Sequence, residues 1–516
     1  MFSLKQKAVL LIAIVAAGCS SDTNGNSKPS LQSGINNHLT HIGSYTTGSV
    51  NKDGGIAEIV VYNKDNQKIY LVNGALGSID IVNADMLSLD NFTQMQLYKR
   101  IDIAAMADEE GFSYGDVTSI DIDTKNDIIA LAVQDTKYTD NGSIVILNYE
   151  GGFIKRYEAG VQPDMVCFSD DGRYILSADE GEPREGYGAI DPKGSVTIVD
   201  TFANTVKTVD FTAFDTKRES LADSGVILRK EALPSNDLEP EYIAVSGGMA
   251  YVSLQEANAI AVLDIASGEF SAIKPLGFKN YNNIALDAVK DGNINITTQN
   301  IYGAYMPDGI AVFETNGTRY LLTANEGDAR EWKDDTDITD NLKIDGKKIE
   351  TLDVSQKDGL ETGKNYLLGA RSFSIYNTDD MTQVYDSGSD FEEFIALNYP
   401  TFFNASHTNN ELDSRSGKKG PEPEYVTVAN IDKKVYAFIG LERFGGVMMY
   451  DVTDPLNAKF HDYINTRNFE SEELAKMGDL GVEGLYVISA EDSPVNKTVL
   501  LTANEVSGTI AVFEIR

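Results

Sequence analysis

The chain has 516 residues, of which 42% are hydrophobic, so it has enough apolar side chains to build a large packed structure. Its 79 acidic side chains against 43 basic ones give a formal charge of -36, which excludes nucleic acid as a partner and favours cations. Acidic surfaces also keep exported proteins soluble, so the charge alone does not establish cation binding.

Residues 1–18 are organised like a lipoprotein signal peptide. A short basic segment precedes the apolar run 8–17, which is shorter than the roughly 20 residues of a membrane-spanning helix. The run leads to Cys19 in a setting that resembles a lipobox, although Ala16 replaces the commoner Leu. We expect export, a lipid on Cys19 that attaches the protein to the membrane, and a location in the outer membrane or at the cell surface. Ordinary signal cleavage is the alternative.

Residues 19–37 are rich in Ser, Asn, Gly and Asp, and predict a flexible, solvated tether. The only other cysteine, Cys167, lies in an apolar stretch and predicts a small buried side chain, not a nucleophile. With Cys19 lipidated, no disulfide framework is expected.

From residue 38 to residue 516 one pattern recurs seven times. Each copy has a short apolar strand preceded by an acidic residue, a second strand with an aromatic residue near its start, and a third strand of small apolar residues. One copy spans residues 163–168, 173–180 and 194–200. Because β-branched and aromatic residues dominate and the alternation has period two, these segments are strands. We predict an all-β fold, a seven-bladed β-propeller of the WD40/YVTN-like class with long loop insertions.

The spacing between copies is irregular, from 48 residues between Asp116 and Asp164 to 116 residues between Asp308 and Glu424. Long loops, among them residues 334–357, therefore interrupt the repeat and project from the faces of the propeller. Residues 41–45 are expected to close the ring by pairing with the last blade. A pair of β-sandwiches is the architectural competitor, but it would not repeat a carboxylate at the start of a strand.

Two positions per copy carry carboxylates that should meet at one channel mouth, one before the first strand and one after the second. The first position holds Glu58, Asp116, Asp164, Glu241, Asp308, Glu424 and Glu483. The second holds Gly74, Asp135, Glu180, Glu256, Glu326, Glu442 and Glu505.

Like charges about 4 Å apart cost roughly 4 kcal/mol at an effective dielectric near 20, so this crowding must be offset. Bound hard cations such as calcium, protonation of some groups, or backbone and arginine partners could do so. Acidic residues of the first series could also simply cap turns. The four histidines show no metal-ligand spacing. The predicted calcium ligands are Asp164, Glu180, Glu241, Glu256, Asp308, Glu326, Glu424, Glu442, Glu483 and Glu505.

Three arginines, Arg184, Arg330 and Arg443, follow glutamates of the second series closely. A guanidinium there could pair with the carboxylates as scaffold, or hold a phosphate or carboxylate ligand beside a metal. The strings Glu-Gly-Glu-Pro-Arg (180–184) and Glu-Gly-Asp-Ala-Arg (326–330) are similar and predict a shared local role.

The sequences of residues 163–173, 238–243, 324–332, 420–426 and 501–505 resemble the choice-of-anchor I family, which is similar to the mesenchyme-specific cell-surface glycoproteins. The likeness implies a constant exported body joined to a surface anchor, here the lipobox, with residues 38–516 as the choice-of-anchor I domain. Members are often labelled alkaline phosphatase-like, and propeller phosphatases and phytases hold calcium with acidic channel residues. Fold alone does not transfer that activity.

Three functions follow as hypotheses. The first is a monomeric surface protein that binds divalent cations, with calcium as the expected ion, and through them a mineral, an extracellular polymer or a phosphorylated small molecule. The second is a metal-dependent phosphoester hydrolase in which an arginine clamps the phosphoryl oxygens. The third is a scaffold that binds another protein and whose acidic rings are structural.

Overall fold

A computed structural model describes residues 38–333 and 335–516. The chain divides into Met1–Gln32 and Ser33–Arg516, and all described residues belong to the second unit. The predicted signal peptide, the tether and the lipidation site at Cys19 lie outside the described residues. Among the residues described, no helix combines the length and the apolar character needed to cross a bilayer.

Four-stranded antiparallel sheets, built from strands that follow one another along the chain, make up most of this unit. The first sheet contains β2 (Val60–Asn63), β3 (Lys68–Asn73), β4 (Ser78–Asn83) and β6 (Leu97–Asp102). The second contains β7 (Asp116–Asp123), β8 (Ile128–Gln134), β9 (Asn141–Leu147) and β10 (Phe153–Val161). The third contains β11 (Pro163–Phe168), β12 (Tyr174–Asp179), β13 (Ser195–Asp200) and β14 (Thr205–Asp210).

The next three sheets repeat this order with longer connections. The fourth contains β16 (Ile243–Ser246), β17 (Met249–Leu254), β18 (Ala259–Asp264) and β19 (Glu269–Pro275). The fifth contains β22 (Ile310–Thr315), β23 (Thr318–Ala324), β30 (Phe373–Asn377) and β31 (Thr382–Asp386). The sixth contains β32 (Pro423–Ile431), β33 (Lys434–Leu441), β34 (Val447–Asp451) and β35 (Lys459–Ile464).

The last sheet joins both ends of the described chain. It contains β36 (Val482–Ile488), β37 (Val499–Asn504), β38 (Thr509–Ile515), β1 (Leu39–Thr46) and the short β5 (Thr93–Gln94). β1 runs antiparallel to β38, with Leu39 opposite Ile515 and Thr46 opposite Thr509. The predicted closing strand at residues 41–45 is therefore confirmed.

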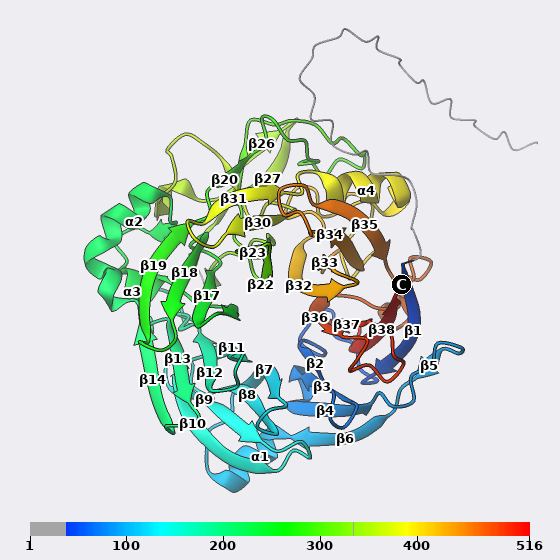
Figure 1. The fold of residues 1–516 in the computed structure, drawn as a ribbon. Coiled ribbons are helices and arrows are strands. Elements are labelled where there is room, and N and C mark those ends of the chain that lie inside the picture. The colour runs from blue at the N-terminus through cyan, green and yellow to red at the C-terminus, as the bar shows by residue number, and fades with distance from the viewer. Residues whose placement is uncertain (1–37, 334) are drawn as a thin grey trace, which may run out of the picture. The chain divides into compact units, whose positions relative to one another are not determined.

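The hydrophobic core lies in layers between neighbouring sheets. One layer lies between the third and fourth sheets and includes Val226 and Leu228 from the connection between them. Equivalent layers lie between the other neighbouring sheets from the first to the sixth. The closing sheet packs against the sixth sheet on one side and the first sheet on the other. Figure 1 shows the sheets around a common centre, with β2, β7, β11, β22, β32 and β36 innermost. This arrangement is a β-propeller.

Stacking between sheets changes the burial pattern that the sequence predicts. The second and third strands, such as β8 and β9, are buried along almost their whole length, because sheets cover both of their faces. The outermost strands β6 and β14 are mostly exposed. The expected period-two alternation is therefore lost in the middle of each sheet. Cys167 is buried within one of these layers, as predicted.

The insertions form small elements outside the four-stranded sheets. Between β23 and β30 lie β24 (Glu331–Trp332), β25 (Asp335–Thr336), β26 (Ile338–Ile344), β27 (Lys347–Leu352), β28 (Lys357–Asp358) and β29 (Tyr366–Leu367). Other connections contain β15 (Leu228–Arg229), β20 (Phe278–Asn280), β21 (Tyr302–Ala304), α1 (Ile103–Glu110), α2 (Arg218–Ser224) and α3 (Pro234–Asp237). The connection from β31 to β32 contains α4 (Asp390–Asn398) and contributes to the site described next.

Candidate functional site

The carboxylates of both repeat positions lie at the ends of the innermost strands. Asp308 precedes β22, and Glu424 and Glu483 are the second residues of β32 and β36. Glu442 directly follows the second strand β33, and Glu326 lies two residues after the end of β23. Since each first strand faces the common centre, the two positions meet at one opening, as expected.

A cavity of about 750 Å³ lies at this opening. Most of the predicted ligands line it, together with Glu58: Asp164, Glu180, Glu241, Asp308, Glu326, Glu424, Glu442, Glu483 and Glu505. Glu256 is buried but is not among the lining residues. Asp116 and Asp135, the carboxylates of the second sheet, also stay outside the lining. The convergence therefore holds for most sheets and fails for the second, whose Asp116 is exposed and whose Asp135 is half-buried.

Burial, followed by charge crowding, raises the pKa values of most of these carboxyl groups. Burial and then the charges of Asp116, Asp164 and Glu505 raise the pKa of Glu58 to about 8. Burial and the neighbouring Glu442 raise that of Glu505 to about 8 as well. Several cavity carboxyls are therefore protonated near neutral pH unless a cation replaces the proton.

Three groups of side chains around the cavity bring possible metal-ligand atoms within 4.8 Å of one another. The first consists of Asp308, Glu424 and Glu483. Among the described residues, no lysine, arginine or histidine forms an ion pair with these three carboxylates. Glu424 is only 9% exposed, and its Oε2 has no hydrogen-bond partner. Burial, followed by repulsion from neighbouring carboxylates, raises all three pKa values well above the usual range.

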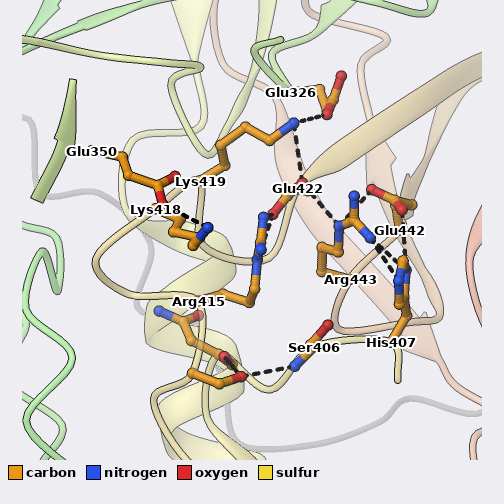
Figure 2. A network of polar contacts seen from close by, with 12 residues as sticks. Glu326, Glu350, Ser406, His407, Arg415, Lys418, Lys419, Glu422, Glu442 and Arg443 are labelled. Carbon is orange, nitrogen blue, oxygen red and sulfur yellow. Dashed lines mark hydrogen bonds and ion pairs between the residues drawn. The ribbon is translucent and has the colours of Figure 1, made fainter. Parts of the chain in front are cut away.

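The second group, Glu326, Glu422 and Glu442, contains its own cations (Figure 2). The ammonium of Lys419 contacts Glu326 and lies 3.2 Å from Oε2 of Glu422. Arg443 Nε lies 3.0 Å from the same Glu422 oxygen. Although burial opposes ionisation, Lys419 and the two neighbouring arginines lower the pKa of Glu422 far below its usual range. Tethered side chains therefore neutralise this group.

The third group combines His407 with Glu442 and Glu505. His407 Nδ1 lies 3.1 Å from Oε1 of Glu442, and the imidazole is 5% exposed. Arg443 Nη1 lies 2.6 Å from His407 Nε2. Burial would raise the pKa of Glu442, but Arg443 and the hydrogen bond with His407 lower it.

Lys419, His407 and Glu422 were not predicted as site residues. They belong to the connection between β31 and β32, which no repeat copy contains. Buried Arg371 holds this connection in place by donating to the carbonyl oxygens of Ser416 and Lys418, each at 2.7 Å. The sequence feature that could have indicated Glu422 is the segment 420–424, in which Glu422 lies two residues before the predicted ligand Glu424.

The three predicted ligand-binding arginines have different environments. Arg330 is 1% exposed, lies outside the cavity lining, and donates to Glu239 at 2.8 Å and to the carbonyl of Asp237. Arg184 is partly exposed and pairs with Glu182 at 3.2 Å. Arg443 alone lines the cavity. The surroundings of Arg330 agree with the scaffold alternative, because its guanidinium is buried among carboxylates.

The similar sequences 180–184 and 326–330 have a backbone turn in common, whereas their arginines, Arg184 and Arg330, have different partners. Gly181 and Gly327 adopt left-handed φ values of 71° and 86° directly after the glutamate. A Cβ on Gly181 would lie 2.5 Å from the carbonyl oxygen of Lys193, and one on Gly327 would lie 2.0 Å from the amide nitrogen of Gly369. Only glycine allows this close backbone approach.

Comparison with known proteins gives partial relatives. Gigasin-3a of Magallana gigas is 31% identical over 181 residues, 32% of this chain and 64% of that protein. A mesenchyme-specific cell surface glycoprotein of Strongylocentrotus purpuratus is 26% identical over 274 residues, 42% of this chain and 35% of that protein. The chain thus spans less than two thirds of either relative.

Among solved structures, the WD40 domain of Neurospora crassa Pan2 is similar with a TM-score of 0.47 at 9% identity, covering 92% of this chain and 95% of that domain. A model of a protein family, described as the choice-of-anchor I domain, matches residues 58–455, which include most of the cavity-lining carboxylates. The chain therefore belongs to the choice-of-anchor I domain family.

Proposed function

We propose that this protein is an exported surface β-propeller with seven blades that binds a calcium ion at Asp308, Glu424 and Glu483. One observation carries the proposal. Of the three groups of ligand atoms around the cavity, this is the group without a cationic side chain as partner among the described residues. Repulsion that the chain leaves uncompensated is what a bound dication would relieve.

The donor set fits a hard cation. Calcium takes about six to eight oxygen ligands and accepts carboxylates in one-oxygen or two-oxygen contact. The group offers only carboxylate oxygens, and the buried Glu424 Oε2 lacks a hydrogen-bond donor. Three carboxylates leave coordination positions for water or for oxygen atoms of a ligand that enters the cavity. A mineral surface, an acidic polymer or a phosphorylated molecule would bring such oxygens.

The proposed location rests on the family and on the sequence before residue 38. Choice-of-anchor I domains and a relative named as a cell surface glycoprotein support a surface role. The lipobox-like sequence at Cys19 supports lipid attachment, with residues 19–37 as tether. The sheet topology supports seven blades, since six four-stranded sheets and the closing sheet correspond to the seven repeat copies.

Cation binding is preferred over phosphoester hydrolysis because the predicted phosphate clamps have carboxylate partners. Arg184 pairs with Glu182, Arg330 with Glu239, and Arg443 with Glu422. A guanidinium whose charge is already balanced by a carboxylate attracts a phosphoryl oxygen less strongly than an unpaired one.

Calcium titration by calorimetry tests the proposal. We expect the purified protein to bind calcium and its Tm to rise with calcium concentration, because a ligand bound only by the folded state stabilises it. Asp308→Asn and Glu424→Gln should each weaken binding at least tenfold. Asp135→Asn, at the second repeat position and outside the cavity lining, is the control. Equal calcium affinity of Asp308→Asn and Asp135→Asn would contradict the proposal.

A further inference from the structure

We propose that His407, Glu442 and Glu505 form a second metal site, which takes a borderline divalent ion such as zinc or cobalt in exchange for the guanidinium of Arg443. This inference goes beyond the proposed calcium site and does not depend on it. The two groups use different side chains, and only this one contains a nitrogen ligand.

The donor set distinguishes the two sites chemically. An imidazole with two carboxylates suits zinc and cobalt, whereas calcium prefers oxygen alone. The possible ligand atoms lie within 4.8 Å of one another. Tetrahedral zinc ligands at about 2.1 Å from the metal lie roughly 3.4 Å apart, so side-chain rotations of modest size bring them into place.

The backbone on both sides of His407 is fixed by a buried cation. Arg467, 6% exposed, donates to the carbonyl oxygens of Ser406 at 2.7 Å and Asn409 at 2.8 Å. The imidazole therefore projects into the cavity from a rigid loop. Such support for a ligand by residues around it is typical of built metal sites.

Glu505 is held as firmly from the opposite side. The backbone N–H of Gly55 donates to its Oε2 at 3.0 Å. Gly54 lies so close that a Cβ there would come within 1.8 Å of the same oxygen, and its φ is 82°. The Gly54-Gly55 turn thus fixes one carboxylate of the group through contacts that glycine alone permits.

Arg443 is the residue that the metal would replace. Its Nη1 lies 2.6 Å from Nε2 and 2.9 Å from Nδ1 of His407. A neutral imidazole has one acceptor nitrogen, so this guanidinium can satisfy only one of the two contacts. The Arg443 side chain is 25% exposed, and its Nε pairs with Glu422 at 3.0 Å. The same Nε lies 3.1 Å from Oε2 of Glu442, so the outer nitrogens of the guanidinium can leave His407 while Nε keeps both carboxylate partners.

Electrostatics favour this exchange. Carboxylates outnumber lysines and arginines in the cavity lining, so the two positive charges of an added metal ion relieve repulsion. Arg443, once displaced from His407, remains in the same acidic cavity and continues to neutralise Glu422.

The test uses the full chain with zinc and cobalt as probes. Zinc affinity is measured by competition with a chromophoric chelator, and cobalt by paramagnetic broadening of imidazole NMR signals, which the presence of only four histidines makes assignable. We expect cobalt to broaden the His407 signal first. His407→Ala should weaken zinc binding at least tenfold, and Arg443→Gln should tighten it severalfold. His461→Ala, a histidine outside the cavity lining, is the matched control.

Gly54→Ala provides a second route that leaves His407 intact, because it displaces Glu505, and it too should weaken zinc binding. Circular dichroism and Tm verify that each variant is folded. Zinc affinity unchanged by His407→Ala, or weakened by Arg443→Gln, would overturn the proposal. Asp308→Asn should leave zinc binding unchanged while it weakens calcium binding, so the two proposals fail separately.

Discussion

The ammonium of Lys419 lies 3.2 Å from Oε2 of Glu422 inside the cavity wall, and it also contacts Glu326. Lys419 thereby pairs with two of the three carboxylates in the group Glu326, Glu422 and Glu442. The chain therefore supplies one of its own cations through a side chain.

Lys419→Met should lower the free energy of unfolding by about 3–5 kcal/mol, because it leaves buried carboxylates without their partner. Calcium should restore more stability to this variant than to the unmodified protein, since the exposed group becomes a cation site. Lys419→Arg, which keeps the charge, is the control. Urea unfolding with and without calcium measures both effects, and an equal calcium response of Lys419→Met and Lys419→Arg would contradict the interpretation.

Stability without added cations should fall as the pH rises from about 4.5 to about 8. Glu58 has an ordinary pKa of 4.5 that burial and neighbouring charge raise to about 8, so the folded state binds more protons than the unfolded state across this window. Each such group lowers the free energy of unfolding by up to about 1.4 kcal/mol per pH unit. Saturating calcium should flatten the dependence. Thermal unfolding at several pH values tests this, and a stability that rises across the window would refute it.

Arg330→Met should destabilise the protein by about 3–5 kcal/mol without changing calcium affinity. The guanidinium is buried against Glu239 and Asp237, whose charges lose their partner. Arg173→Met is the control, because Arg173 pairs with Asp200 at the exposed edge of a sheet and should matter much less. Urea unfolding and calorimetry separate the two effects. A large loss of calcium affinity in Arg330→Met would instead assign this residue to the site.

Tyr45→Phe should cost about 1–2 kcal/mol. The Tyr45 hydroxyl donates to Oδ2 of buried Asp80 at 2.8 Å and so links the closing strand to the first sheet. Asp80 keeps Arg100 as partner, which limits the loss. Tyr98→Phe removes an exposed hydroxyl with a 3.3 Å contact and is the matched control. Tm values of the two variants provide the comparison, and an equal decrease would show that the Tyr45 hydrogen bond contributes nothing specific.

The repeat made much of the architecture predictable from sequence. Strand positions, the closing strand at residues 41–45 and the convergence of Asp308, Glu424 and Glu483 follow from a local pattern that each sheet repeats. The loss of alternation in middle strands was not expected, since it arises from stacking between sheets and not from any strand by itself.

The cationic side of the cavity could not be predicted in the same way. Lys419 and His407 come from a unique connection whose path depends on remote contacts, such as those of Arg371 and Arg467 with backbone carbonyls. The sequence around His407 has no metal-ligand spacing, but this does not exclude a site, because its partners Glu442 and Glu505 follow strands of two different sheets. Likewise, nothing in the sequence around Arg330 distinguishes a buried partner of Glu239 from a ligand clamp.

Pairing of β1 with β38 also sets the order in which the molecule can be completed. During synthesis, β1 cannot pair until the residues of β38 have been made. Joining segments so distant in sequence costs roughly 5 kcal/mol of loop-closure entropy. Folding should therefore end with a slow step in which the nascent chain already holds stacked sheets but retains two unpaired edges. That open intermediate exposes unpaired main-chain groups at both edges, and loss of residues 509–515 would leave β1 without its main-chain partner.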